Sequence, residues 1–166
     1  NISKVNFIST DDVHTLADYY EQMLKEMRDA AGSNGEFYTP RPVIRFIVNT
    51  INPDLKKSPR ILDPACGTGG FMVESLDHLS KQVKSNKDHQ KLFEKTVFGI
   101  EKKPMPFLLA MMNLLLHDVD DPNIANANTL GHPFSDITDE NQYDVIVTNP
   151  PFGGEEEREL KSNLPT

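Results

Sequence analysis

The chain has 166 residues, enough to bury a core without disulfides or a structural metal. A formal net charge of −8 argues against nucleic acid as an obvious partner of this domain alone, because a phosphate backbone attracts lysine and arginine. The one cysteine excludes an internal disulfide, no signal peptide is visible, and the longest apolar run is about half of a membrane span. These features favour a cytoplasmic protein. Because the first residue is not methionine and the last strand motif lies near the end, we expect a piece of a longer chain.

Two helices are predicted in the first third of the chain. Apolar residues recur at helical spacing over residues 11–31, which predicts an amphipathic helix that ends at the sequence GSNGE. The stretch FYTPRP, residues 37–42, is predicted to be extended because each proline biases its predecessor away from helix. Pro42 then suits the first turn of a second helix, whose apolar face reaches Ile51.

Strands alternate with helices through the rest of the chain. The strand candidates are residues 60–63, 96–101, 143–148 and, more weakly, 123–130. A helix follows the glycine loop at 64–70, and the helix at 107–117, which Pro104 and Pro106 open, is apolar nearly all round, so we expect it to pack deep against a sheet. This alternation predicts a parallel, doubly wound α/β sheet with helices on both faces. Ligands of such sheets bind beyond the carboxyl ends of the strands.

The glycine loop DPACGTGGF is the first candidate for a ligand site. Gly67, Gly69 and Gly70 would let the backbone turn tightly and let a ligand approach closely. The dinucleotide fingerprint is not met, because Met72 stands where its last glycine is required, and no P-loop lysine follows. Asp63 enters the loop and no basic residue lies in it, which favours a cationic or neutral ligand over a polyphosphate. The alternative is a plain strand-to-helix turn, which requires fewer glycines.

Glu101, at the end of the second strand, can accept hydrogen bonds from the two hydroxyls of a ribose. The alternative is a surface glutamate paired with Lys102 or Lys103. Cys66 is predicted to be a small buried thiol rather than a nucleophile, because no histidine is near it in sequence. We predict no metal site, because metal-ligand spacing is absent among the histidines, which are His14, His78, His89, His117 and His132.

The sequence YDVIVTNPPFGG ends a core strand with an unusual loop. Asn149 offers a side-chain carbonyl, while Pro150 and Pro151 lack N–H donors and hold the corner rigid. Phe152 adds a flat apolar face. Acceptors beside a stacking ring suit a planar group that carries NH₂, such as a flipped base. The alternative, a proline turn that caps a strand, does not explain the asparagine and the phenylalanine together.

These motifs resemble a known family. DPACGTGGF followed by NPPFGG is similar to the amino-group DNA methyltransferases that use S-adenosylmethionine. With GEFYTPRPVIRFIV and FGIEKKPMPFLLAMMNLLLHD, the chain resembles, over about residues 11–155, the methylation subunit of type I restriction–modification systems. The resemblance implies a Rossmann-like methyltransferase fold that is truncated after its fourth strand. It also implies that residues 1–35 end an N-terminal helical region and that residues 36–166 begin the catalytic domain.

The resemblance implies roles for particular residues. The methionine end of the cofactor would be held by Glu36, Phe37, Tyr38, Thr39, Pro40 and Arg41, where a hydroxyl and amides near a helix start favour a carboxylate. The loop beside the cofactor would be lined by Asp63, Gly67, Thr68, Gly69 and Gly70. Glu101 would bind the ribose, and Asn128 would meet the cofactor adenine through its side-chain oxygen. The target adenine would be clamped by Asn149, Pro150, Pro151 and Phe152.

The family implies methyl transfer to the exocyclic amino group of adenine in DNA, within a multi-subunit complex. A specificity subunit would read the DNA and a restriction subunit would act as motor and nuclease, which fits the acidic charge of this chain. The piece alone is expected to be inactive. Cytosine ring-carbon methylation is excluded, because the loop after the fourth strand carries no cysteine. Two alternatives remain: an RNA or protein-glutamine methyltransferase with the same cofactor, and a non-catalytic nucleotide-binding module of the NAD type. The missing last glycine argues against the second of them.

Overall fold

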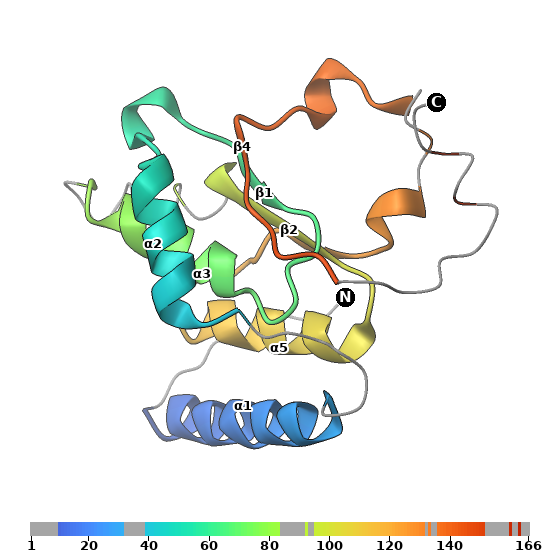
Figure 1. Cartoon of the computed structure of the whole chain (residues 1–166). Helices are drawn as coiled ribbons and strands as arrows, with labels where there is room; N and C mark the ends of the chain where they lie inside the picture. The colour runs from blue at the N-terminus through green and yellow to red at the C-terminus, as the bar shows by residue number, and fades with distance from the viewer. Residues whose placement is uncertain are drawn as a thin grey trace.

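The computed structural model describes residues 10–31, 39–83, 92, 95–131, 133, 136–151, 160 and 163. The helices are α1 Thr10–Ala31, α2 Arg41–Ile51, α3 Gly70–Ser80 and α5 Pro104–Leu115, and the strands are β1 Ile61–Asp63, β2 Val97–Glu101, β3 Ile124–Asn126 and β4 Val145–Ile146. Short 3-10 turns lie at Leu55–Lys57, Thr129–Gly131 and Asp139–Asn141. The predicted alternation of strands and helices is confirmed (Figure 1).

The four strands form one parallel sheet in the order β3-β2-β1-β4. Ile61 of β1 pairs with Val97 of β2 on one side and with Val145 of β4 on the other. Beyond the paired residues, Arg60 N donates to Asp144 Oδ2 at 2.7 Å and fixes the start of β4. The chain therefore moves outward in one direction from β1 to β3 and then returns to the opposite side of β1. Ligand sites of open α/β sheets form at such a reversal of strand order.

Three helices share one core with the sheet. Right-handed crossovers that run in the same direction, from β1 to β2 and from β2 to β3, place their helices on the same face. The core joins α2, α3, α5 and the strands through Ile44, Val48, Ile61, Phe71, Met72, Val73, Leu76, Leu79, Val97, Ala110, Leu114 and Val147. The parallel sheet is confirmed. Among the described helices α2, α3 and α5 lie on this face, so a second helical layer stays a prediction.

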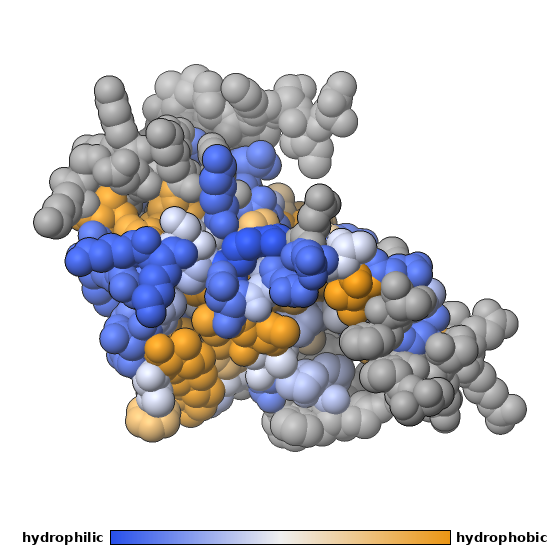
Figure 2. Space-filling view, turned by 90° about the horizontal axis from the view of Figure 1, so that it is seen from above, coloured by the Kyte–Doolittle hydropathy of each residue, from blue (hydrophilic) through white to orange (hydrophobic). Residues whose placement is uncertain are grey.

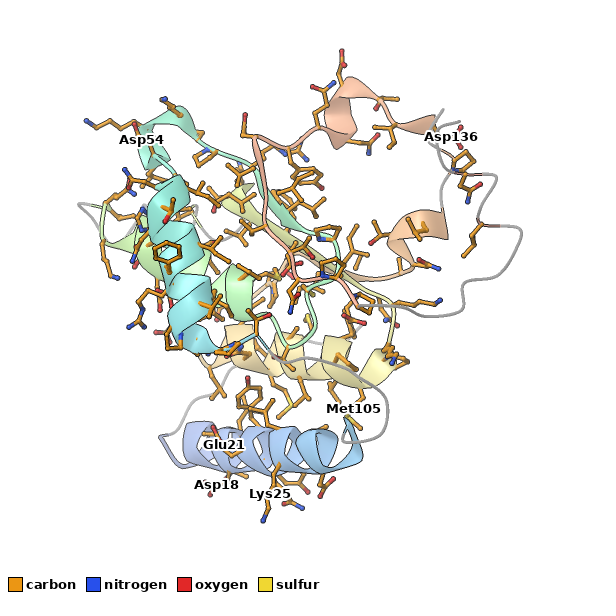
Figure 3. The ribbon with its side chains drawn as sticks, viewed as in Figure 1. Asp18, Glu21, Lys25, Asp54, Met105 and Asp136 are labelled. Atoms are coloured by element: carbon orange, nitrogen blue, oxygen red, sulfur yellow. The ribbon has the colours of Figure 1, made fainter. Side chains whose placement is uncertain are left out.

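The helix α5 lies between the sheet and α1 (Figure 1). Tyr20 of α1 is buried against Leu109 and Met112 of α5 in a second, smaller cluster. Asp18 and Lys25 point away from α5 (Figure 3). Packing on two sides explains why this helix is apolar nearly all round, and its predicted burial is confirmed.

Apolar side chains also reach the surface. Phe46 of α2 is 71% exposed and Ile146 of β4 is 61% exposed. Figure 2 shows apolar groups interrupting a largely hydrophilic face seen from above. Within the residues that the structure describes, no helix combines the length and apolar character needed to cross a membrane.

Candidate active site

The glycine loop follows β1 directly, and its glycines serve different purposes. Gly67 and Gly69 have φ angles of 55° and 78°, which glycine adopts without steric cost. A Cβ on Gly69 would lie 3.4 Å from the Cβ of Ala110, which is van der Waals contact, so the positive φ rather than a lack of space favours glycine there. Among the residues that the structure describes, none would lie within 4 Å of a Cβ on Gly67, so the described part of the loop borders open space there. At Gly70, a Cβ would lie 2.8 Å from Ile44 Cδ1, which indicates close packing of α2 on α3.

Glu101 ends β2 as predicted, and its carboxylate accepts hydrogen bonds from two backbone amides, one of which belongs to the glycine loop. Its Oε2 accepts a hydrogen bond of 2.9 Å from the amide of Gly67. Its Oε1 accepts one of 2.8 Å from the amide of Lys103. The half-buried carboxylate therefore joins the ends of β1 and β2, at the carboxyl edge of the sheet where a ligand is expected.

Asp63, at the end of β1, is a buried carboxyl with 2% of its surface exposed. Burial raises its pKa from 3.8 to about 6, while the amide of Ala65 and the hydroxyl of Thr148 lower this pKa and the charge of Glu101 raises it. The Ala65 amide donates to Asp63 Oδ1 at 3.2 Å. The buried Thr148 hydroxyl forms no hydrogen bond of normal geometry with a described residue. A positive charge nearby would favour the ionised form of Asp63.

Two further residues fix the backbone of the glycine loop: Cys66, which lies within the loop, and Asn113 of α5. The thiol of Cys66 is buried, as predicted, and burial raises its pKa, so it lacks the thiolate character of a nucleophile. The amide of Cys66 donates to the carbonyl of Ile100 at 3.0 Å. On the other side, Asn113 of α5 donates from Nδ2 to the carbonyl of Thr68 at 2.9 Å. Both contacts fix backbone that borders the open space at Gly67.

The loop after β4 comes to the same edge of the sheet. Val147 N donates to Leu62 O at 3.0 Å, so parallel pairing reaches the residue before Thr148. Asn149 follows, and its Nδ2 donates to Thr39 Oγ1 at 2.9 Å. This part-buried contact joins residues that are 110 positions apart. Thr39 lies two residues before α2, so the structure brings together the segment that the resemblance assigned to the cofactor and the segment that it assigned to the target base.

The loop after β3 approaches the glycine loop from the other side. Thr129 Oγ1 donates to the carbonyl of Pro64, and Ala127 N donates to the carbonyl of Glu101 at 3.1 Å. The side-chain oxygen of Asn128 accepts from Leu130 N at 3.0 Å in a local turn. Its contact with a cofactor adenine stays a prediction. The remaining predicted site residues, which are Glu36, Phe37, Tyr38 and Phe152, lie outside the described residues.

Comparison with known proteins decides the family. Residues 11–164 match the N-6 DNA Methylase family. The chain belongs to this family. It is 46% identical to the type I restriction enzyme EcoEI methylase subunit of Escherichia coli, over 99% of this chain and 33% of that protein. It is 34% identical to the StySPI methylase subunit of Salmonella potsdam, over 87% of this chain and 28% of that protein.

A solved chain from a type I restriction–modification system superposes with a TM-score of 0.80 at 41% identity, over 98% of this chain and 33% of that chain. The resemblance to type I methylation subunits and the methyltransferase fold are thus confirmed. This N-6 DNA methylase chain spans about a third of the length of its curated relatives.

Sequence reasoning missed two residues of this N-6 DNA methylase. Asn113 is 2% exposed and donates to the Thr68 carbonyl. The one indication of this role in the sequence was a single amide side chain within the largely apolar run FLLAMMNLLLH. Thr148 directly precedes the predicted loop, but a threonine at the end of a strand is too common to stand out in sequence. The segments at the start of α2 and after β4 also contain four other predicted site residues, which are Pro40, Arg41, Pro150 and Pro151.

Proposed function

We propose that the protein transfers a methyl group from S-adenosylmethionine to the exocyclic amino group of adenine in DNA, as the methylase subunit of a type I restriction–modification complex. The observation that carries this proposal is the position of Asn149. Its side-chain amide lies at the reversal of strand order, after β4, beside the glycine loop and against Thr39. An amide oxygen is a suitable acceptor for an amino group.

The residues at the glycine loop fit this cofactor. Open space at Gly67 leaves room for a ligand that touches the backbone. Each oxygen of Glu101 accepts one backbone hydrogen bond, and a carboxylate has about four acceptor sites, so capacity remains for ribose hydroxyls. Asp63 supplies a buried carboxyl that a cation would stabilise in its ionised form. This set favours a cationic nucleoside and offers no basic side chain for a diphosphate.

When held by Glu101 and the glycine loop, the cofactor would supply a methyl carbon that the sulfonium makes electrophilic; methyl transfer would form the carbon–nitrogen bond, break the carbon–sulfur bond and release one proton from the nitrogen to solvent. The task of the protein is to make a weak nucleophile attack, because the amino lone pair of adenine is delocalised into the ring. Asn149 Oδ1 and the Pro150 carbonyl accept from the two N–H bonds and favour a pyramidal nitrogen. The sequence pattern assigns Phe152, which lies outside the described residues, to stack on the base and fix its plane. The catalysis is therefore positioning and electrostatic preorganisation, without a covalent intermediate on the protein.

The same proposal accounts for the charge and the domain organisation. A chain with a net charge of −8 requires partners that carry the basic surface for DNA. We assign that task to a specificity subunit, with a restriction subunit in the same complex. Residues 1–35 then end a helical region, and residues 36–166 begin the catalytic domain.

The test uses the full-length methylase subunit with its specificity subunit. Calorimetry should show saturable binding of S-adenosylmethionine and none of NAD, with binding weakened by Glu101→Ala. The matched control is Glu26→Ala, since Glu26 lies on α1 and contacts Gln22. Radiolabelled methyl should appear on duplex DNA as N6-methyladenine. Transfer to RNA or to protein glutamine without the specificity subunit would favour the second candidate substrate class instead, and binding of NAD would contradict the proposal.

A further inference from the structure

The two polar atoms of the Asn149 amide have different capacities. Nδ2 can only donate hydrogen bonds, and Oδ1 can only accept them. An amino group that is to be methylated presents N–H donors, so Oδ1 is the atom that must face it. An amide that rotates by 180° about its last bond presents Nδ2 instead and repels the substrate. The orientation of this amide therefore decides whether the loop after β4 can accept hydrogen bonds from the amino group.

One hydrogen bond in the structure holds this amide in place. Nδ2 of Asn149 donates to Thr39 Oγ1 at 2.9 Å, which places Oδ1 on the other side of the amide. A part-buried amide that moved away from Thr39 would leave Nδ2 without this acceptor, and leaving a donor unsatisfied is more costly than the hydrogen bond alone is favourable.

Both ends of this contact are stiff. Thr39 precedes Pro40, and Asn149 precedes Pro150, and a residue before proline has a restricted backbone. The carbonyl of Pro40 accepts from Val43 N at 2.9 Å and from Ile44 N at 3.2 Å, so the segment is anchored to the start of α2. A hydroxyl held at a fixed place positions an amide more precisely than a hydroxyl on a mobile loop.

We propose that Thr39 is a positioning residue, which holds the Asn149 amide with Oδ1 facing the amino group of the target base. The inference rests on the proposed function and deepens it, because the sequence assigned Thr39 to the methionine end of the cofactor. The two roles make different predictions. A residue that acts through Asn149 affects the reacting base, and a residue that binds the cofactor affects the affinity for it.

The test compares Thr39→Val, which removes the hydroxyl at nearly constant shape, with Thr39→Ser, which keeps it. The full-length methylase subunit with its specificity subunit is used. We expect Thr39→Val to lower kcat by about ten- to hundredfold, the range typical of a misplaced reacting group, and to leave the Kd for S-adenosylmethionine within about twofold. Thr39→Ser should restore most of kcat. Thr50→Val is the matched control, because the Thr50 hydroxyl donates to the Phe46 carbonyl on the exposed side of α2.

A second readout needs no turnover. 2-Aminopurine placed next to the target adenine becomes more fluorescent when that adenine leaves the stack, and the clamp on its amino group should stabilise the flipped state. Thr39→Val should weaken the signal in the wild-type background and have no further effect in an Asn149→Ala background, because residues that act through one another are not additive. Should Thr39→Val fail to fold by circular dichroism, Thr39→Ala takes its place in both measurements.

The outcomes separate the two proposals. An unchanged kcat in Thr39→Val overturns the inference, and so does a raised Kd for the cofactor with an unchanged kcat at saturation, which would return Thr39 to the cofactor site. An additive effect in the Asn149→Ala background also overturns it. If the wild-type complex binds no S-adenosylmethionine or methylates no DNA, the proposed function fails, and the inference fails with it.

Discussion

The backbone amide of Gly67 lies 2.9 Å from Glu101 Oε2, so the carboxylate that ends β2 holds the loop that follows β1. The second oxygen binds the amide of Lys103 in the same way. One anion thus connects two adjacent strand ends, and a ligand at this place meets backbone that is already fixed. Changes at Glu101 should therefore alter both the loop and the ligand.

Glu101→Gln keeps the size of the side chain but removes its charge, and Glu101→Ala removes both. Hydrogen bonds to a charged group contribute about 1.5–3 kcal/mol, and about 1.4 kcal/mol corresponds to a tenfold change in affinity. We expect the Kd for S-adenosylmethionine to rise at least about tenfold in Glu101→Gln and further in Glu101→Ala, measured by calorimetry. Wild-type affinity in Glu101→Ala would show that this carboxylate does not face the ligand.

Gly67→Ala and Gly69→Ala form a matched pair at the glycine loop. Both substitutions place a Cβ on a left-handed residue, which costs about 1–2 kcal/mol. The Cβ on residue 67 would point into open space, whereas the one on residue 69 would pack on Ala110. We expect similar losses in the free energy of unfolding, measured in urea. Only Gly67→Ala should lose cofactor affinity beyond what its stability explains, and equal affinities would contradict a ligand at Gly67.

Asn113→Leu should destabilise the protein without touching a ligand. The substitution leaves the Thr68 carbonyl without its donor at a site that is 2% exposed, and an unsatisfied buried group costs about 1–3 kcal/mol. The free energy of unfolding in urea is the measurement. A change below about 0.5 kcal/mol would mean that the loop relaxes and finds another donor.

The raised pKa of Asp63 should make stability depend on pH. The pKa in the folded protein is about 6 against 3.8 for the ordinary side chain, so the folded state binds more protons between these values. Stability from this group is therefore fully present below about pH 4 and is lost as pH rises through about 6. The shift corresponds to about 3 kcal/mol at 1.36 kcal/mol per unit. Asp63→Asn should abolish this fall between pH 4 and 7 in denaturant titrations, and an identical pH profile would refute the assignment.

Sequence patterns predicted the strand ends well, because an apolar run that stops at an acid marks both Asp63 and Glu101. They predicted the boundaries less well. The apolar helix was expected to open at Pro104 and Pro106 and begins at Pro104, but the expected helix reached residue 117 and α5 ends at Leu115. The fourth strand, expected over residues 143–148, has its bounds at Val145–Ile146, although its backbone hydrogen bonds to the β1 segment extend from Asp144 to Val147. It lies at the edge of the described sheet, so β1 alone can extend its pairing, and β1 has three residues.

The motifs of the site were visible in sequence, but the contacts among them were not. The hydrogen bond between Thr39 and Asn149 depends on how α2 packs against α3 and the sheet, and local spacing carries no information on that arrangement. The same holds for Asn113, whose partner Thr68 is 45 residues away. Periodicity reports which side of a helix is buried, and the identity of a long-range partner follows only from the packed fold.

The pairing of β1 with β4 has a kinetic consequence. Arg60 and Asp144, which start these strands, are 84 residues apart, whereas β1, α3 and β2 follow one another along the chain. Closing the longer loop carries the greater entropic cost, so the edge formed by β4 should join the sheet after the more local pairs. Because Asn149 follows β4, the amide acceptor reaches its place only in this last step. Under the proposed function, a chain that has collapsed around its first strands would lack the acceptor for the target base, so methyl transfer would require that β4 has joined the sheet.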